Sequence, residues 1–197
     1  MNLPNKLSIL RIIMIPITLL FMLPISIYGF QPEGWNSFIT EHGMLIAAIM
    51  FIIASLTDML DGKIARKYNL ITNLGKFLDS LADKMLVIAV LIAFVELGRI
   101  SAWWLMIITL REFMVTGIRM LASEKGVVMA AKMIGKIKTT TQMIAIIFLM
   151  FEPTICKIAG LTAGTINPVT IIGDVLFGIC VIMTVVSGLD YLIKNKN

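Results

Sequence analysis

Long apolar segments are the feature of this sequence that most restricts its fold. A helix needs roughly 20 apolar residues to cross a hydrocarbon layer about 30 Å thick. Six segments come close to the required length, and each predicts a membrane-spanning helix: 8–30, 43–62, 79–97, 101–123, 133–152 and 168–192. We expect Pro16 and Pro24 to kink the first of these helices.

The overall composition points to the same fold class. Apolar residues make up 58% of the chain and charged residues 15%, whereas a soluble domain carries about 25% charged residues. A soluble fold of this size could not bury so much apolar surface. The sequence therefore predicts an all-α, polytopic membrane protein with six transmembrane helices, built as a single domain over residues 1–197.

Lysine and arginine are distributed unevenly between the segment ends. With the N-terminus in the cytoplasm, fifteen of the 17 basic residues fall on the inner side, and only Arg99 and Lys157 fall outside. This bias is typical of inner loops and helix ends, so we expect both termini to be cytoplasmic and the protein to reside in the cell membrane. It also accounts for the net charge of +5 without a nucleic-acid partner. The outer loop Gln31–Gly43 would place Trp35 and Phe38 at the membrane interface.

Histidine and cysteine are too few to support several kinds of site. His42 is the single histidine, which argues against a histidine-based zinc site or a Ser-His-Asp triad. Cys156 and Cys180 lack the spacing of metal ligands, and we interpret both as unpaired structural residues.

Four aspartates form the most informative pattern in the chain: Asp58, Asp61, Asp79 and Asp83. The first pair is spaced i, i+3 and the second i, i+4, so each pair shares one face of a helix. The pairs lie at the inner ends of two predicted spans joined by a short loop, where they can converge. Converging carboxylates repel one another, and two Mg²⁺ or Mn²⁺ ions would hold them together. Such a pair of metals supports in-line phosphoryl displacement, with Asp79 as a candidate bridging ligand.

The residues between the two pairs suit a phosphate ligand. Gly62 and Gly75 permit close approach of the backbone, Arg66 offers a fork of donors, and Thr72 adds a hydroxyl group. A structural interpretation stays open for each of them alone, because Arg66 could pair with an aspartate and the glycines could serve helix packing.

The pattern Asp58-x2-Asp61-Gly62-x2-Ala65-Arg66-x8-Gly75-x3-Asp79-x3-Asp83 resembles the signature of the CDP-alcohol phosphotransferase family. The resemblance implies an enzyme that takes a phosphatidyl group from CDP-diacylglycerol, a substrate held among membrane lipids, with CMP as the leaving group. It also implies a homodimer with its active site at the cytoplasmic face. Asp83 would be the general base for the acceptor hydroxyl. The metal ligands would be Asp58, Asp61, Asp79 and Asp83, and the CDP-lipid site would comprise Asp58, Asp61, Gly62, Ala65, Arg66, Thr72, Gly75 and Asp79.

A second group of charged residues concerns the acceptor alcohol. Arg111 lies inside an apolar segment, where a charge is costly and usually faces a cavity or a partner. Arg119, Lys136 and Lys138 lie at the inner ends of the same and the next predicted span. Cations gathered beside the metal site indicate an acceptor that carries its own phosphate, although the lysines could also belong to a solvated positive-inside loop. We expect Glu112 to neutralise Arg111 or a neighbouring lysine.

The order Arg-Glu, Gly-x-Arg and Gly-Lys-x-Lys-Thr-x-x-Gln over 111–142 resembles the phosphatidylglycerophosphate synthase branch of this family. The opening Leu3-Pro4-Asn5-x-Leu7-Ser8-x2-Arg11 resembles it too. The resemblance implies sn-glycerol 3-phosphate as the acceptor. Two alternatives stay open: the same chemistry with another acceptor such as inositol phosphate or serine, and a cation transporter that uses intramembrane carboxylates.

Overall fold

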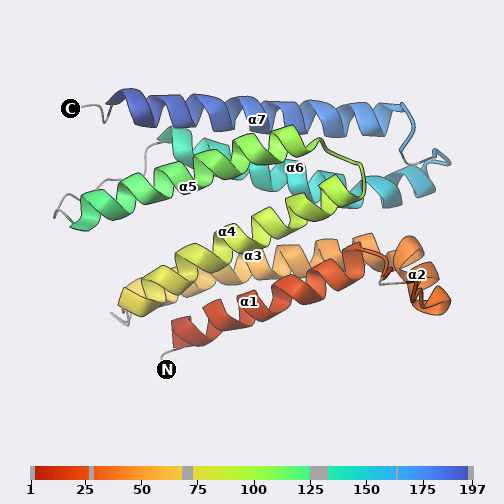
Figure 1. Cartoon of the computed structure of the whole chain (residues 1–197), viewed down its shortest axis with the longest axis horizontal. Helices are drawn as coiled ribbons and strands as arrows, with labels where there is room; N and C mark the ends of the chain where they lie inside the picture. The colour runs from red at the N-terminus through yellow and green to blue at the C-terminus, as the bar shows by residue number, and fades with distance from the viewer. Residues whose placement is uncertain (1–2, 27–28, 68–72, 125–132, 163, 195–197) are drawn as a thin grey trace. The chain divides into compact units, whose positions relative to one another are not determined.

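The structure is a computed structural model in which every described regular element is helical (Figure 1). It describes the backbone of residues 3–26, 29–67, 73–124, 133–162 and 164–194, and their side chains except at 3–6, 58–67, 73–80, 123–124 and 194. The all-α prediction is confirmed. The elements are α1 (Leu3–Met22), α2 (Glu33–Phe38), the π-helix η1 (Ile39–Gly43), α3 (Met44–Lys67), α4 (Asn73–Glu96), α5 (Ala102–Glu124), α6 (Met133–Ile158) and α7 (Pro168–Lys194).

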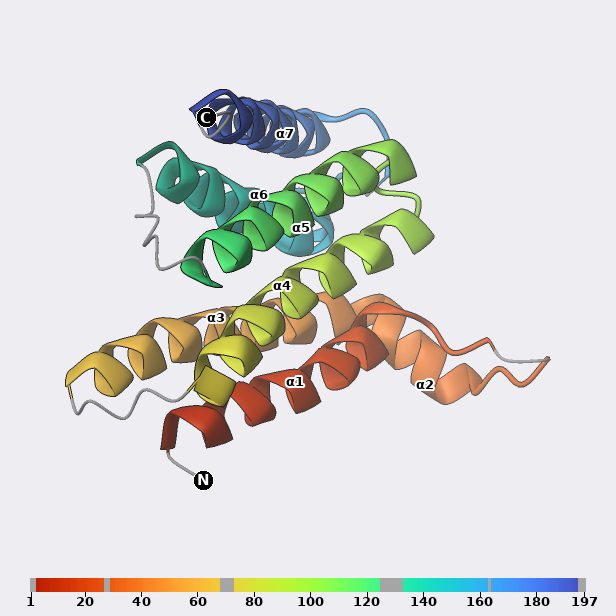
Figure 2. The same ribbon diagram turned by 60° about the vertical axis from the view of Figure 1, so that its left-hand side comes forward.

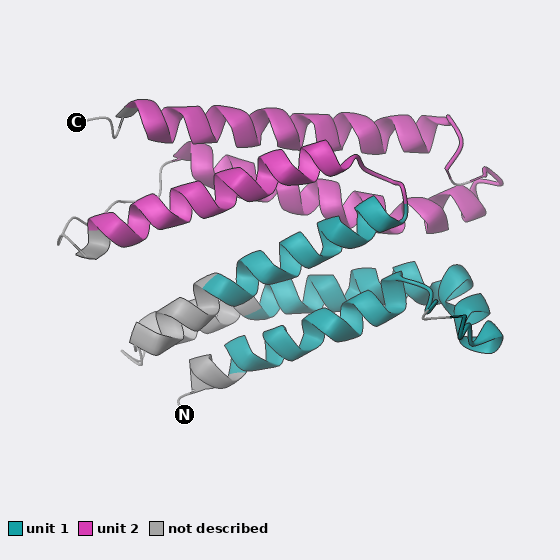
Figure 3. Cartoon of the chain, viewed as in Figure 1, with its two compact units in different colours: residues 1–97 teal, residues 98–197 magenta. Residues whose placement is uncertain are grey.

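The chain divides into two compact units, residues 1–97 and 98–197, which Figure 3 colours teal and magenta. In the first unit α1 packs against both α3 and α4, and in the second α7 packs against α6 and α5, as Figures 1 and 2 both show. Each unit has its own apolar core. Buried core side chains include Phe51, Val90 and Phe94 in the first unit, and Ile108, Ile146, Leu149 and Met150 in the second.

Three helical stretches in the described chain are long and apolar enough to cross a membrane: Glu33–Thr57, Met133–Ile158 and Pro168–Ile193. The last of these also exposes apolar side chains along its whole length. Contiguous apolar surface of this extent is unfavourable in water and suits contact with lipid tails. The exposed apolar residues of α7 are Ile171, Ile172, Val175, Ile179, Ile182, Val185, Val186, Leu189, Leu192 and Ile193. The protein is therefore a membrane protein, while the count of six spans stays a prediction.

The first predicted span and the loop after it differ from the structure. The helix α1 contains Pro16 but ends at Met22, so Pro24 follows the helix instead of kinking it. The cause is local, because a proline disfavours helical backbone in the residue before it. The expected loop Gln31–Gly43 is mostly helical, since α2 and η1 run directly into α3.

Long-range contacts hold α2 and η1 in place. The side chain of Asn36 donates to the carbonyl of Ile25 at 3.0 Å and accepts from its N–H at 2.9 Å. The indole ring of Trp35 lies 5.7 Å from the ring of Phe21 and 6.0 Å from that of Phe38. These contacts fix a short helix that has no strong local signal of its own.

Gly43 at the end of η1 allows a close approach to the backbone of α1. A Cβ atom at this position would lie 2.2 Å from the backbone oxygen of Phe21 and 2.9 Å from Cγ2 of Ile39. We expect Gly43→Ala to lower the free energy of unfolding by about 1–3 kcal/mol, because the backbone oxygen cannot rotate away. Thermal unfolding in detergent measures this. Gly34→Ala in α2 is the control, because nothing lies within 4 Å of its added Cβ. Equal Tm values for the two variants would contradict the prediction.

Candidate functional site

The predicted donor site lies on α3 and α4 in the first unit. Asp58 and Asp61 are in α3, and Asp79 and Asp83 are in α4. Neither helix is interrupted there, so the i, i+3 and i, i+4 spacings keep each pair on one helix face. Both helices pack against α1 and contact each other. Asp61 lies six residues before the end of α3, and Asp79 lies six residues after the start of α4, so the aspartates lie within these helices and not at their ends, as the predicted spans had placed them.

These positions fit a pair of hard divalent cations by the chemistry of their donors. Carboxylate oxygens are the ligands that Mg²⁺ and Mn²⁺ take in proteins, and two neighbouring helices supply two each. Asp83 is half-buried in α4. The remaining predicted donor-site side chains lie outside the described part of the chain, so their roles stay predictions: Asp58, Asp61, Gly62, Ala65, Arg66, Thr72, Gly75 and Asp79.

Arg111 of α5 is held by two partners in the second unit. Its Nη1 donates to Glu112 Oε1 at 3.1 Å, and its Nη2 donates to Ser187 Oγ of α7 at 2.5 Å. Its Nε is buried and has no hydrogen-bond partner among the described residues. A buried donor without an acceptor costs free energy, so this arginine has capacity for a further anion.

Glu112 also binds the neighbouring lysine of α6. Lys138 is buried and donates to Glu112 Oε1 and, at 2.5 Å, to Gln142 Oε1. The expectation that Glu112 neutralises Arg111 or a lysine is confirmed, because it contacts both. Lys138 is therefore paired with Glu112 beside Arg111 and does not face open space.

A small, partly open pocket brings Arg111 and Arg119 together. Arg119 donates from Nε to the hydroxyl of Tyr191 at 3.0 Å, and its guanidinium carbon lies 5.5 Å from the centroid of the Tyr191 ring. Lys136 is exposed beside Gly135, and neither Lys136 nor Lys138 lines the pocket. The polar or conformationally important lining residues are Arg111, Arg119, Gly135, Ser187, Asp190 and Tyr191.

Three of these lining residues were missed by the sequence reasoning. Ser187, Asp190 and Tyr191 all lie on α7, in the predicted span 168–192. Their spacing of i, i+3 and i, i+4 in an apolar segment is a signal, because it places polar groups on one helix face. The partners of Ser187 and Tyr191 on α5 lie more than 70 positions earlier in the chain, and no local pattern indicates them.

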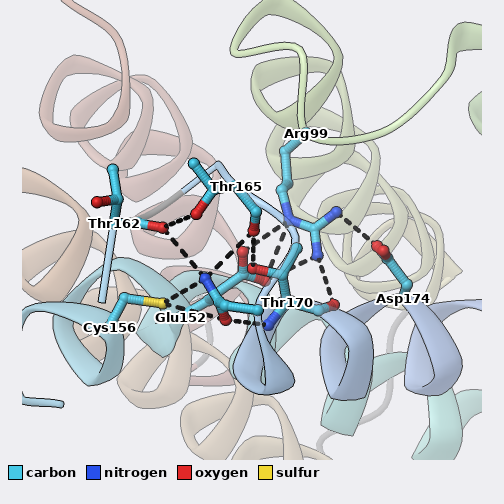
Figure 4. Close-up of polar contacts among 8 residues, drawn as sticks. Arg99, Glu152, Cys156, Thr162, Thr165, Thr170 and Asp174 are labelled. Atoms are coloured by element: carbon cyan, nitrogen blue, oxygen red, sulfur yellow. Dashed lines mark hydrogen bonds and ion pairs between the residues drawn. The ribbon is translucent and has the colours of Figure 1, made fainter. Parts of the chain in front are cut away.

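A second polar cluster joins the loop before α5 to α6 and α7 (Figure 4). Arg99 binds the buried carboxylate of Glu152 through Nε at 3.1 Å and Nη2 at 2.8 Å, and binds Asp174 through Nη1 at 2.7 Å. Burial lowers the pKa of Arg99, but hydrogen bonds and charges from Glu152 and Asp174 outweigh it, so the pKa lies above its ordinary value. The guanidinium stays charged, and the cluster connects the loop before α5 to α6 and α7.

Cys156, one of the two cysteines interpreted from the sequence as unpaired structural residues, lies in the same region. Cys156 and Cys180 are both buried and free. Cys156 lies beside Asn167, whose side-chain oxygen accepts from the N–H of Thr170 at 2.9 Å and so caps the start of α7. Figure 4 shows Cys156 and Thr170 in this network.

Comparison with known proteins places the chain in a family. The family model for CDP-alcohol phosphatidyltransferase matches residues 1–188. A relative from Bacillus subtilis (strain 168) named CDP-diacylglycerol–glycerol-3-phosphate 3-phosphatidyltransferase is 43% identical, covering 98% of this chain and 95% of that protein. Relatives of the same name from Rickettsia bellii (strain RML369-C) and Mycoplasma pneumoniae (strain ATCC 29342 / M129 / Subtype 1) are 33% and 39% identical, covering 96% and 76% of this chain and 93% and 68% of their own lengths. The chain belongs to the CDP-alcohol phosphatidyltransferase family.

Proposed function

We propose that this protein transfers the phosphatidyl group of CDP-diacylglycerol to sn-glycerol 3-phosphate, with phosphatidylglycerophosphate and CMP as products. The observation that carries this proposal is the similarity, over nearly the whole chain, to relatives named for that reaction. The aspartate pattern on α3 and α4 supports the donor half of the reaction. The arginine pocket of α5 and α7 supports the acceptor half.

The pocket suits the phosphate of the acceptor. Arg111 has a buried, unpartnered Nε–H, and Arg119 uses only its Nε in the contacts that the structure describes. Phosphate oxygens would accept from the remaining N–H groups, and hydrogen bonds between arginine and phosphate are strong and directional. Lys138 would offset the charge of Glu112 beside Arg111, and Lys136 would contribute from its exposed position beside the pocket-lining Gly135.

The donor half follows from the carboxylates. Asp58, Asp61, Asp79 and Asp83 would hold two divalent cations, Mg²⁺ or Mn²⁺, and these would neutralise charge on the transferred phosphate and stabilise a developing alkoxide. Gly62, Ala65, Arg66, Thr72 and Gly75 would complete the binding site for the CDP group. The structure describes none of these side chains except that of Asp83.

Asp83 would act as the general base. It takes the proton of the acceptor hydroxyl, and the hydroxyl oxygen forms a bond to the phosphorus on the lipid side. The bond from that phosphorus to the CMP oxygen breaks, and CMP leaves. A carboxylate is a weak base for an alcohol, so this step needs positive charge nearby.

The setting of the reaction is part of the proposal. The distribution of lysine and arginine supports six spans with both termini and the active site on the cytoplasmic side of the cell membrane. A soluble acceptor and CMP exchange freely there, while the lipid donor stays in the bilayer. The functional protein would be a homodimer.

The direct test measures CMP release. Purified protein in detergent, given CDP-diacylglycerol, glycerol 3-phosphate and Mg²⁺ or Mn²⁺, is expected to release CMP. Chelation with EDTA should abolish release, because the carboxylates would then repel one another and the phosphate charge would be uncompensated. Excess Mn²⁺ should restore it. CMP release that continues at full rate in EDTA would contradict the two-metal mechanism.

A second acceptor class is favoured by the same pocket. The arginines recognise a phosphate, so an inositol phosphate would also be held. A competition assay decides between the two acceptors. In one reaction glycerol 3-phosphate is labelled and unlabelled inositol phosphate is added, and in the other the labels are exchanged. Incorporation of the label into lipid is measured in both. Turnover with inositol phosphate and none with glycerol 3-phosphate would overturn the proposed acceptor and leave the reaction type standing.

A further inference from the structure

The C-terminal part of α7 contacts both arginines of the acceptor pocket. Ser187 accepts a hydrogen bond from Arg111 at 2.5 Å, and Tyr191 accepts one from Arg119 at 3.0 Å. Ser187 and Tyr191 are both buried. We call Ser187, Gly188 and Tyr191 the α7 seat. Neither Ser187 nor Tyr191 supplies a reacting group in the proposed reaction, so their hydrogen bonds to the two arginines need an explanation other than catalysis.

The spacing of these contacts draws the two guanidinium groups together. Arg111 and Arg119 are eight positions apart on α5, whereas Ser187 and Tyr191 are four positions apart on α7. At a rise of about 1.5 Å per residue, the first separation is about 12 Å along the helix and the second about 6 Å. The hydrogen bonds therefore join two arginines to partners that lie closer together along α7 than the arginines do along α5. Both arginines line the same pocket.

Gly188 makes room for this arrangement. An added Cβ at Gly188 would lie 3.1 Å from Cγ of Arg111, which is tight for such a contact. The aliphatic part of Arg111 thus crosses α7 at the one residue of the seat that has no side chain. Its guanidinium then reaches the hydroxyl of the preceding residue, Ser187.

Tyr191 holds Arg119 by two different interactions. The hydroxyl accepts the Nε–H, and the ring lies beneath the guanidinium carbon at 5.5 Å. Together these fix the plane of the guanidinium. In the contacts that the structure describes, Arg119 donates through Nε alone, so its two terminal nitrogens can donate to an anion.

We infer that the α7 seat is a positioning device that orients Arg111 and Arg119 so that both donate to one phosphate group of the acceptor. This inference rests on the proposed function. It assigns Ser187 and Tyr191 a role in acceptor affinity that is distinct from packing α5 against α7. Preorganised donors bind an anion more tightly than freely rotating ones, because less conformational entropy is lost on binding.

The test uses Ser187→Ala and Tyr191→Phe in the full-length protein in detergent. Each removes one hydroxyl, and Tyr191→Phe keeps the ring beneath Arg119. The KM for glycerol 3-phosphate should rise about tenfold in each, the effect of losing one charge-assisted hydrogen bond. The KM for CDP-diacylglycerol and the Tm should stay unchanged. Ser187→Thr retains a hydroxyl and should recover most of the affinity.

Thr184→Ala is the matched control. Thr184 is also a buried hydroxyl residue of α7, but it donates only to the backbone oxygen of Cys180, at 2.8 Å. Its loss should leave the KM for glycerol 3-phosphate unchanged. An equal rise in KM for Thr184→Ala would overturn the inference, because any buried hydroxyl of α7 would then matter.

Failure of the inference differs from failure of the proposed function. If the wild type turns over glycerol 3-phosphate and both variants keep its KM, the inference is wrong and the function stands. If the wild type releases no CMP, calorimetric titration of glycerol 3-phosphate still compares the variants without turnover. The inference then predicts a Kd weakened about tenfold in both variants, and an unchanged Kd overturns it.

Discussion

Replacing Asp83 by asparagine is expected to lower CMP release by about 10³-fold. Asparagine keeps the shape of the side chain but cannot take the proton of the acceptor hydroxyl, and it is a weaker ligand for a divalent cation. Asp83 is half-buried, so the change in charge should leave the fold intact. The measurement is the rate of CMP release at saturating CDP-diacylglycerol, glycerol 3-phosphate and Mg²⁺.

A matched substitution at the other polar cluster serves as the control for this prediction. Asp174→Asn makes the same chemical change on α7, where the carboxylate is 60% exposed and pairs with Arg99. We expect its rate to stay within about twofold of the wild type, since an exposed ion pair contributes little. Undiminished release by Asp83→Asn would remove Asp83 from the mechanism. Asp79→Asn, tested beside it, is expected to lose activity to a similar extent.

Replacing Arg99 by alanine is expected to be the most destabilising change outside the active site. The carboxylate of Glu152 is only 3% exposed and receives hydrogen bonds from two nitrogens of Arg99. Without that arginine the buried charge has lost its partner, which costs about 3 kcal/mol or more. The Tm in detergent should fall by about 6–12 °C, at roughly 2–4 °C per kcal/mol for a chain of this size.

Two further variants separate the ion pair from other effects of removing Arg99. Asp174→Ala removes the exposed partner and should change the free energy of unfolding by less than about 1 kcal/mol. The double variant Arg99→Ala, Glu152→Gln removes the buried charge along with its partner and should recover part of the lost stability. A Tm for Arg99→Ala equal to that of Asp174→Ala would contradict the structural importance of the buried pair.

The sequence alone predicted the later helices closely. The segments 101–123 and 168–192 correspond to α5 at Ala102–Glu124 and α7 at Pro168–Lys194, whereas α4 at Asn73–Glu96 begins six residues before the predicted segment 79–97. Long apolar runs are local features, and every backbone group inside a helix finds its partner four residues away. The aspartate spacing is local in the same sense, which explains why the family could be inferred from one segment.

The region after α1 shows where local reasoning failed. A continuous apolar run suggested a span to residue 30, but the helix ends at Met22 and α2 begins at Glu33. Pro24 disfavours helical backbone in the residue before it, but we expected it to kink the helix and not to end it. The helical form of 33–43 depends on Asn36 binding the backbone of Ile25 and on Trp35 packing against Phe21.

The pocket of Arg111 and Arg119, which we propose for the acceptor, could be predicted only in part from the sequence. The sequence alone singled out Arg111, because a charge inside an apolar segment needs a cavity or a partner. It singled out Arg119, Lys136 and Lys138 as cations at the inner ends of predicted spans. Only the tertiary structure decided that Ser187 and Tyr191 hold them and that Lys138 turns to Glu112 instead. The reason is geometric. Apolar content determines that a helix forms and enters the membrane, but packing between helices determines how each is rotated about its axis, and that rotation selects which polar side chains meet.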